Sequence, residues 1–314
     1  MKRKKLLLVY NPVSGKGSIV RNLHGIISLF SASGYDVTAY PTACVGDGER
    51  FIAENAQSYD VVCSCGGDGM LHELFNGIRE QDRNKPCGYI PAGTMNDFAS
   101  SLGLPKEMMQ AADVVTRENF RYIDAGVFCG ERFAYVAAFG AFTEISYNTD
   151  TQLKNMLGAF AYFIEGLRTF ELYYFDNMSE RLTITYGDTV IEDDFVFGMA
   201  GNTLSVAGLT RLVPSGAAMD DGLLDCMFIR SPRSLQDLER IRAALVDESL
   251  PTEHILRFRT ESIVVESASP VHWDLDGEYG GAVTRAEISV QPRAVRIAVP
   301  TEMTAIEFDP VNNI

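Results

Sequence analysis

Residues 65–73 (CGGDGMLHE) limit the possible folds of this chain more than any other stretch, because a glycine-rich turn here separates an apolar run from a helical pattern. Residues 59–65 have the length and β-branched content of a buried strand, and Leu71, Leu74 and Ile78 follow at helical spacing. Glycine lets backbone N–H groups approach a phosphate, and the N-terminus of the following helix directs its positive end to the same place. The stretch predicts a phosphate-binding loop, with a plain strand-to-helix turn as the alternative.

Asp68 adds a carboxylate to this loop. A carboxylate beside a bound phosphate is repulsive unless a divalent cation or a proton lies between the two groups. Asp68 is therefore a candidate for organising a metal-bound phosphate.

Two further strand ends carry polar loops of the same kind. The apolar residues 6–10 lead into residues 11–18 (NPVSGKGS), and residues 87–90 lead into residues 91–98 (PAGTMNDF). Strands that alternate with helices indicate a parallel sheet, and ligands of such sheets bind at the carboxyl ends of the strands. We therefore expect the three loops to meet at one sheet edge and form one site.

Lys16 and Asp97 are charged residues of these two loops. Residues 11–18 resemble a P-loop in composition but lack its spacing, so Walker-type chemistry is not expected. Lys16 is either a phosphate contact or an exposed lysine in a turn. Asp97 is either a carboxylate of the site or an N-terminal helix residue that the helix dipole favours.

The pattern changes near residue 128. Residues 1–127 alternate strand and helix signals, which predicts an α/β domain whose helices flank a parallel sheet. Residues 128–314 carry many strand-like runs, with a hairpin signal at residues 187–188, which predicts an antiparallel β-sandwich. The segment from about residue 295 is a candidate to return to the first domain. A helical segment within residues 153–175 has a broad apolar face that fits either core packing or a wall for an acyl chain.

The net charge of -15 restricts the partners of the chain. A phosphate backbone is bound mainly through clustered Lys and Arg, so we expect no nucleic-acid partner. The basic residues 2–5 are either a solvated start or a membrane anchor, and the apolar run behind them is too short for a signal peptide or a transmembrane segment. We expect a cytoplasmic protein with reduced cysteines, and the sequence leaves the oligomeric state open, a homodimer included.

Two acidic clusters lie in the second half. Asp220-Asp221-Gly222 suits a hard cation, with a solvated β-turn as the alternative. Asp274, Asp276 and Glu278 occupy alternate positions, which predicts that they face one side of a strand. Such crowding raises a carboxyl pKa and can produce a base near neutral pH.

The motifs, taken in order, resemble the catalytic domain of the diacylglycerol kinase family, and most of all its bacterial soluble lipid kinases. They are residues 11–15, 66–69 and 93–98, followed in the second half by residues 219–225 and 276–281. The resemblance covers nearly the whole chain. The wider superfamily includes NAD kinases and phosphofructokinases, so the resemblance implies an α/β domain of that kind, followed by the β-sandwich.

The resemblance also implies a nucleotide-binding set. Its members are Asn11, Pro12, Val13, Ser14, Gly15, Thr42, Gly66, Gly67, Asp68, Gly69, Met70, Leu71, His72, Glu73 and Thr94. The family usually has Thr where this chain has Met70 and Asn where it has His72, so two polar contacts to the nucleotide are missing or replaced.

Roles in catalysis and metal binding follow from the same resemblance. Asp68 and Asp97, with Lys16 nearby, would organise magnesium and phosphate, and Asp124 would link this network to the second domain. Glu278 would be the base that takes the proton from the acceptor hydroxyl. The Asp221 carboxylate and the carbonyl groups of Ala218 and Leu223 would form a structural magnesium site.

The function implied is ATP- and magnesium-dependent phosphorylation of a lipid hydroxyl, with diacylglycerol as the first candidate acceptor and phosphatidate as the product. The lipid would be reached by transient peripheral association with a membrane. Phosphorylation of NAD and a non-catalytic nucleotide- or lipid-binding regulator remain alternatives.

Overall fold

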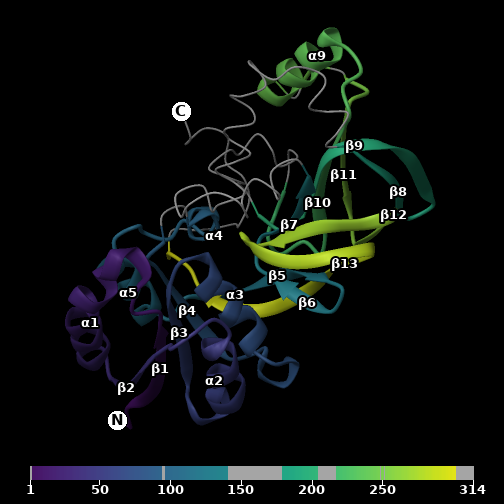
Figure 1. Cartoon of the computed structure of the whole chain (residues 1–314). Helices are drawn as coiled ribbons and strands as arrows, with labels where there is room; N and C mark the ends of the chain where they lie inside the picture. The colour runs from purple at the N-terminus through teal and green to yellow at the C-terminus, as the bar shows by residue number, and fades with distance from the viewer. Residues whose placement is uncertain are drawn as a thin grey trace.

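The computed structural model describes residues 2–93, 96–140, 179–203, 217–247, 249–250 and 252–301, and only the backbone of Lys16, Asp97 and Val246. Two halves lie against each other, the first mixed α/β and the second mostly β (Figure 1). The apolar helical segment expected within residues 153–175 and the proposed nucleotide contact Thr94 lie outside the described residues.

The first half is built on parallel strands in the order β4-β3-β1-β2. Their bounds are β1 Lys4–Tyr10, β2 Tyr35–Pro41, β3 Val61–Gly66 and β4 Pro86–Pro91. Residues Leu6 to Val9 and the whole of β3 are buried, as expected for strands covered on both faces.

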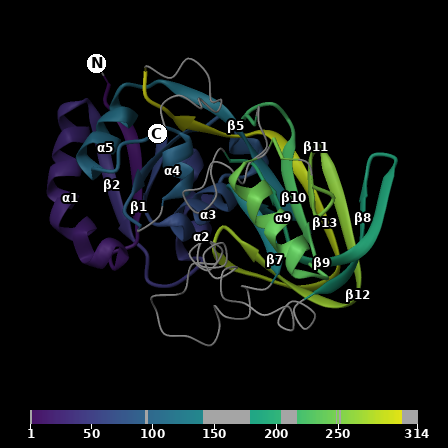
Figure 2. The same cartoon turned by 90° about the horizontal axis from the view of Figure 1, so that it is seen from above.

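Helices cover both faces of this parallel sheet. Figures 1 and 2 show α1 and α5 on one side and α2 and α3 on the other. The helices are α1 Ser14–Ala32, α2 Asp47–Asn55, α3 Asp68–Gly77, α4 Asp97–Ser101 and α5 Met108–Thr116, with 3-10 turns at Ala56–Ser58 and Glu80–Asp82. The expected α/β domain is confirmed.

The second half is an antiparallel β-structure around its own apolar core. Its elements are β5 Phe120–Phe128, β6 Glu131–Phe133, β7 Val136–Gly140, β8 Glu180–Tyr186, β9 Thr189–Gly201, β10 Leu224–Arg230, α9 Leu235–Val246, β11 Ile255–Thr260, β12 Ser262–Leu275 and β13 Glu278–Ala298. Trp273 is buried, with its ring centroid 5.1 Å from that of Phe128 and 4.9 Å from that of Phe139. The expected sandwich is confirmed, including the hairpin in which Tyr186 pairs with Thr189.

One long strand joins the two halves. The first part of β13 pairs with β12, and its end pairs in parallel with β4, through Arg296 with Pro86 and Ile297 with Cys87. Antiparallel β5 pairs with the second part of β13, from Ile288 to Ala298. The two sheets are therefore continuous, and this continuity fixes the position of the second half against the first.

Several surface expectations can be compared with the described residues. No helix among them is long and apolar enough to cross a bilayer. Within the basic start, Arg3 is paired with Asp36 and Lys4 with Glu118, so part of the expected basic patch is neutralised by neighbours. All six cysteines are free thiols; Cys44 and Cys129 are exposed and the other four are buried.

Candidate functional site

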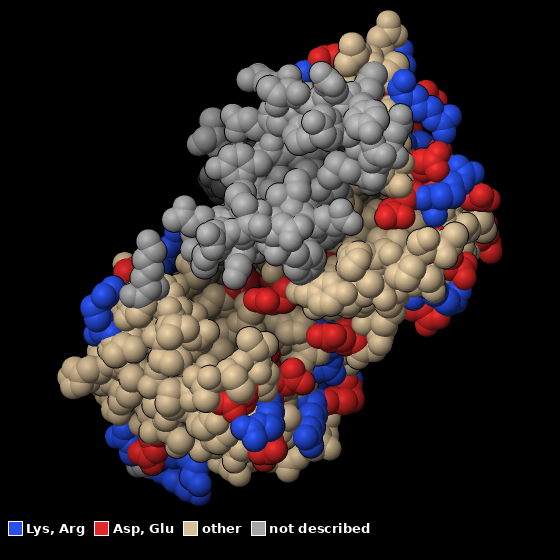
Figure 3. All heavy atoms as spheres, in the orientation of Figure 1, with Lys and Arg blue, Asp and Glu red and all other residues tan. Residues whose placement is uncertain are grey.

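A pocket of about 520 Å³ lies where the two halves meet. Figure 3 shows Asp and Glu side chains gathered along this hollow. The first half supplies Asn11, Ser14, Val45, Gly67, Asp68, Gly69, Met70, His72, Glu73 and Gly93, and the second supplies Glu131, Tyr135, Asp276, Gly277, Glu278 and Tyr279. Residues distant in the sequence thus form one polar cavity.

The first wall of the pocket is made of strand-end loops that contact one another through their backbones. The Asn11 N–H donates to the Cys65 carbonyl over 3.1 Å, and the Ala92 N–H donates to the Gly66 carbonyl over 2.7 Å. A Cβ at Gly93 would lie 2.9 Å from Gly67 Cα, so this approach requires glycine. The three loops meet at one sheet edge, as expected.

The segment after β1 differs from the expected loop. Helix α1 already begins at Ser14, so residues 14–18 form its first turn. The Asn11 side chain accepts a hydrogen bond from the Val13 N–H over 3.0 Å, which closes a short turn directly before the helix. A polar, glycine-rich composition concealed this early start.

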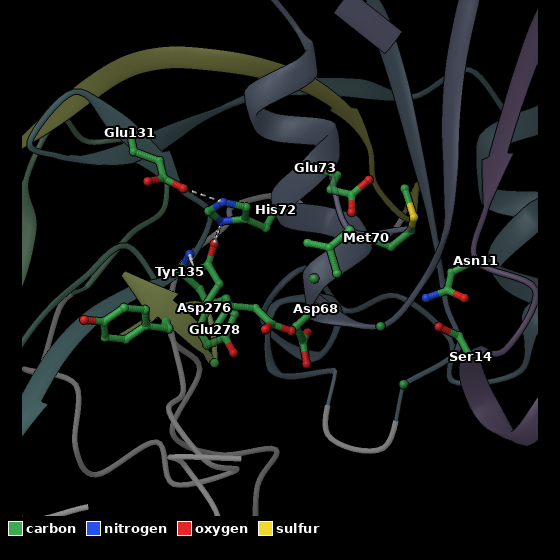
Figure 4. Close-up of a pocket in the computed structure, with 16 residues that line it drawn as sticks. Asn11, Ser14, Asp68, Met70, His72, Glu73, Glu131, Tyr135, Asp276 and Glu278 are labelled. Carbon is green, nitrogen blue, oxygen red and sulfur yellow. Dashed lines mark hydrogen bonds and ion pairs between the residues drawn. The ribbon is translucent and has the colours of Figure 1, made fainter. Parts of the chain in front are cut away.

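Asp68 is the first residue of α3 and lies opposite Glu278, the first residue of β13. In Figure 4 the two carboxylate side chains lie side by side in the cavity. A Cβ at Gly69 would be 3.3 Å from Glu278 Oε1, so the helix backbone and the glutamate are almost in contact. The proposed base and the proposed phosphate-organising carboxylate therefore share one pocket.

The second wall is a tight hairpin, and here one expectation is wrong. Strand β12 ends at Leu275, which pairs with Glu278, so Asp276 and Gly277 form a two-residue turn. Both have positive φ, 55° and 87°, as an Asp-Gly hairpin turn requires. Asp274, Asp276 and Glu278 therefore do not lie along one strand face.

The Asp276 carboxylate fixes this turn to the start of β7. Its oxygens accept hydrogen bonds from the backbone N–H groups of Ala134 over 2.6 Å, Tyr135 over 2.9 Å and Val136 over 3.2 Å. The Asp276 N–H donates back to the Val136 carbonyl over 2.9 Å. Because the carboxylate is buried and its partners are backbone groups, the turn has little freedom to move.

Asp274 is buried beside this turn and outside the cavity lining. Burial raises the pKa of Asp274 to about 7, and the negative charges of Asp276 and Glu278 add to the rise, while a hydrogen bond from the Gly277 backbone opposes it. The expected carboxyl with a raised pKa therefore exists at Asp274, mainly because of burial.

His72 joins α3 to the second wall. Its Nδ1 lies 3.1 Å from Asp276 Oδ2 and its Nε2 lies 3.1 Å from Glu131 Oε1 (Figure 4). Burial lowers the pKa of His72, but the hydrogen bonds and charges of Asp276 and Glu131 outweigh it and raise the pKa to about 10. The imidazole, 13% exposed, is therefore a largely enclosed cation between two carboxylates at neutral pH.

Other members of the expected nucleotide set have different surroundings. The Glu73 carboxylate accepts hydrogen bonds from the N–H groups of Gly46, Gly48 and Glu49, and thereby holds the N-terminus of α2. Leu71 is fully buried and Met70 packs under Gly48 and Gly66. Both Glu73 and Met70 still line the cavity, whereas Leu71 does not.

The remaining expected residues are divided between the rim and the undescribed side chains. Pro12, Val13, Gly15, Thr42 and Gly66 flank the loops but are not part of the lining. The structure does not describe the side chains of Lys16 and Asp97, so the roles of these two residues stay predictions.

Asp124 of β5 binds two other segments of the second half through their backbone N–H groups. Its carboxylate accepts hydrogen bonds from the N–H groups of Gly222 and Arg293, both over 2.7 Å. Burial raises the pKa of Asp124, and these two bonds oppose the rise. The residue fastens β5 to residues 219–222 and to β13, which places the Asp220-Asp221-Gly222 turn.

The residues of the predicted structural magnesium site are Ala218, Asp221 and Leu223, and the Asp221 carboxylate is engaged by protein groups. It accepts hydrogen bonds from the Arg259 guanidinium and from the Leu223 N–H. Across the described ranges, no group of three or more His, Cys, Asp or Glu side chains is arranged to hold a metal ion. This arrangement does not fit a cation at Asp221 unless Arg259 moves away, so the ligand set stays a prediction.

Several residues of the site have no local sequence pattern that marks them as functional. Two of them, Glu131 and Tyr135, line the cavity. A third, Asn76, lies in the contact between α3 and β6. Asn76 follows His72 by one helical turn, so its position on the same face was readable. Glu131 and Tyr135 could not be found, because their approach depends on the pairing of β5, β6 and β13.

Comparisons with known proteins agree across both halves. Residues 5–128 match the family described as the diacylglycerol kinase catalytic domain, and residues 138–299 match the YegS C-terminal NAD kinase beta sandwich-like domain. A diacylglycerol kinase of Bacillus subtilis (strain 168) is 30% identical over 301 residues, covering 95% of this chain and 97% of the relative. One of Staphylococcus saprophyticus is 35% identical over 282 residues, covering 89% and 90%.

A solved structure shares the fold. The crystal structure of a diacylglycerol kinase from Bacillus anthracis str. Sterne has a TM-score of 0.79 and 26% sequence identity to this chain. The matched region covers 96% of this chain and 98% of the Bacillus anthracis chain. The similarity therefore extends over both halves.

Proposed function

The chain belongs to the diacylglycerol kinase family, and from this premise we propose that it transfers the γ-phosphoryl group of ATP to the hydroxyl group of diacylglycerol, giving phosphatidate. The observation that carries the proposal is the shared pocket in which Asp68 of the first half faces Glu278 of the second. A base on one wall and a phosphate loop on the other are what transfer to a hydroxyl requires.

The acidic pocket is suited to a metal-bound nucleotide. Carboxylates that converge on one cavity repel a triphosphate unless divalent cations lie between them. Asp68 and Asp97 are the residues proposed to hold magnesium, which would neutralise charge on the transferred group. The loop amides and the N-terminus of α3 would orient the phosphates.

In the proposed reaction Glu278 accepts the proton of the lipid hydroxyl. The hydroxyl oxygen then forms a bond to the γ-phosphorus while the bond from that phosphorus to the bridging oxygen of ATP breaks, and ADP leaves. Positioning supplies much of the rate in such a transfer, since the phosphoryl group needs little covalent help. The rigid turn next to Glu278 supports this role.

The acceptor would come from a membrane, which the protein would reach from the cytoplasm by transient peripheral association. The screen that tests the proposal combines labelled ATP, magnesium and mixed micelles of diacylglycerol, with sphingosine, undecaprenol and extracted membrane lipids in parallel. Label in phosphatidate is expected. Label only in another lipid would move the proposal to that acceptor, and no label in any lipid would overturn it.

NAD is a second candidate acceptor, because residues 138–299 match an NAD kinase beta sandwich-like domain. Phosphorylation of NAD needs no micelles, so the same screen with aqueous NAD separates the two. Turnover of NAD at a higher kcat/KM than diacylglycerol would favour the soluble acceptor.

A further inference from the structure

His72 lies one helical turn after Asp68, so both side chains are on the same face of the helix. Both line the cavity. The imidazole therefore extends from the helix that carries Asp68 toward the wall that carries Glu278.

A doubly protonated ring lets His72 donate to both of its carboxylate neighbours, consistent with its raised pKa. Asp276 and Glu131 are carboxylates, which accept but do not donate when ionised. The neighbouring Asn76 Nδ2 lies 3.2 Å from His72 Nε2, but its two N–H groups donate to the His72 carbonyl over 3.1 Å and to the Arg132 carbonyl over 2.9 Å. Each imidazole N–H is thus available for one carboxylate, and neither is available for a nucleotide.

The two carboxylates lie on different elements of the second half. Glu131 starts β6, and Asp276 is in the turn two residues before Glu278. Because the Asp276 carboxylate is also held by three backbone N–H groups, a displacement of His72 relative to this turn is transmitted to a rigid unit. The imidazole thus connects the helix of Asp68 with the hairpin of Glu278.

A separate set of bonds attaches α3 to β6. The Arg132 guanidinium donates to the carbonyl groups of Phe75 and Ile78, and the Arg132 N–H donates to the Asn76 side chain. These bonds hold the C-terminal end of α3, away from Asp68. They keep the helix docked when His72 is changed, whereas the direct bond to the hairpin is lost.

We propose that His72 is a positioning residue that sets the separation of Asp68 and Glu278 across the pocket, by tying α3 to the Asp276-Gly277 turn. The inference rests on the proposed phosphoryl transfer, since its consequence is a slower chemical step. It assigns to His72 a role other than the nucleotide contact expected at this position.

The test compares steady-state kinetics of His72→Leu and His72→Gln with the intact protein. Leucine has no donor, so kcat is expected to fall about 10- to 100-fold, because small misplacements of reacting groups have effects of this size. KM for ATP is expected to change less than about threefold, since the loop amides are untouched. Glutamine keeps one donor and should give an intermediate kcat, which would be a partial rescue.

His254→Gln is the matched control. His254 pairs with Asp237 over 3.3 Å and its side chain is 12% exposed, against 13% for His72, but it lies outside the cavity lining. It should lower the melting temperature without changing kcat. An unchanged kcat in His72→Leu, an increase in KM for ATP in place of a decrease in kcat, or an equal loss in His254→Gln would each overturn the proposal.

Hydrogen exchange separates this inference from the proposed function. In His72→Leu the amides of residues 275–280 are expected to exchange at least about tenfold faster than in the intact protein, while those of α5 keep their rates. This readout needs no substrate and so remains decisive if the intact protein phosphorylates no lipid. Unchanged exchange at residues 275–280 would contradict the positioning role.

Discussion

The two walls of the pocket are built by different physical means. The first wall consists of backbone at the ends of parallel strands, where Gly67 and Gly93 approach closely and side-chain bonds such as that of Asn11 stay within one loop. The second wall is one hairpin turn whose place depends on side-chain bonds of Asp276 and His72. Substitutions in the first wall should therefore affect activity through steric crowding and loss of charge. Substitutions in the second wall should act through lost hydrogen bonds.

The largest effect is expected at the charge of the first wall. Asp68→Asn removes a carboxylate proposed to organise the metal-bound phosphate, so kcat/KM should fall about 10³-fold, as for other losses of electrostatic stabilisation. Steady-state kinetics with saturating magnesium measure this, and circular dichroism checks the fold. Activity within tenfold of the intact protein would show that the first wall does not depend on this charge.

Asp276→Asn tests the second wall. The asparagine amide keeps one acceptor oxygen, but its NH₂ group replaces the other oxygen. N–H donors then face the backbone N–H groups of residues 134–136 or the His72 ring. We expect the free energy of unfolding to fall by about 2–4 kcal/mol, the range for buried charged hydrogen bonds that lose a partner. Urea denaturation gives the value. Asn tolerates positive φ, so the substitution adds no backbone strain and the measured loss reports the hydrogen bonds alone. A loss below about 0.5 kcal/mol would contradict the role of these bonds.

Gly69→Ala brings the two walls into contact. Its Cβ would lie 3.3 Å from Glu278 Oε1, so the glutamate must move by tenths of an ångström. We expect kcat to fall about tenfold, while alanine stabilises the helix by up to about 1 kcal/mol. Kinetics and thermal denaturation of the same sample separate the two effects. Loss of both activity and stability would mean that the residue acts through folding.

The smallest effect concerns the pH dependence of stability at His72, which faces Asp276 of the turn, Glu131 of β6 and, at longer range, Glu49 of α2. Its pKa is raised from 6.5 to about 10, so its contribution to stability is complete below pH 6.5 and is lost as the pH rises through 10. The difference in unfolding free energy between the intact protein and His72→Gln should shrink from pH 6.5 to 10. A constant or growing difference would exclude the imidazolium.

The sequence was informative about the first wall because its signals are local. A strand, a glycine turn and a helix follow one another in residues 59–78, and the rule that parallel strands end at one edge brings the loops together. The start of α1 at Ser14 was missed, because a turn at Asn11 and a loop of small polar residues have the same composition. The fold class was predictable for the same reason, from strand and helix patterns.

The second wall was less predictable because its contacts are distant in the sequence. Asp276 binds the backbone of residues 134–136, and His72 reaches it from the other half, so neither contact leaves a periodic signal. The turn itself was readable, since Asp-Gly between apolar runs is a hairpin signal that should have outweighed the alternation of carboxylates. Likewise, nothing local showed that Glu73 holds the start of α2.

The most direct test of the account is the rate of phosphatidate formation by Glu278→Gln, measured with labelled ATP, magnesium and diacylglycerol micelles. Glutamine keeps the size of the side chain and removes only the ability to accept a proton. The account predicts a loss of at least about 10²-fold in kcat with nearly unchanged KM for ATP. A rate within threefold of the intact protein would contradict the assignment of the hairpin glutamate as the base.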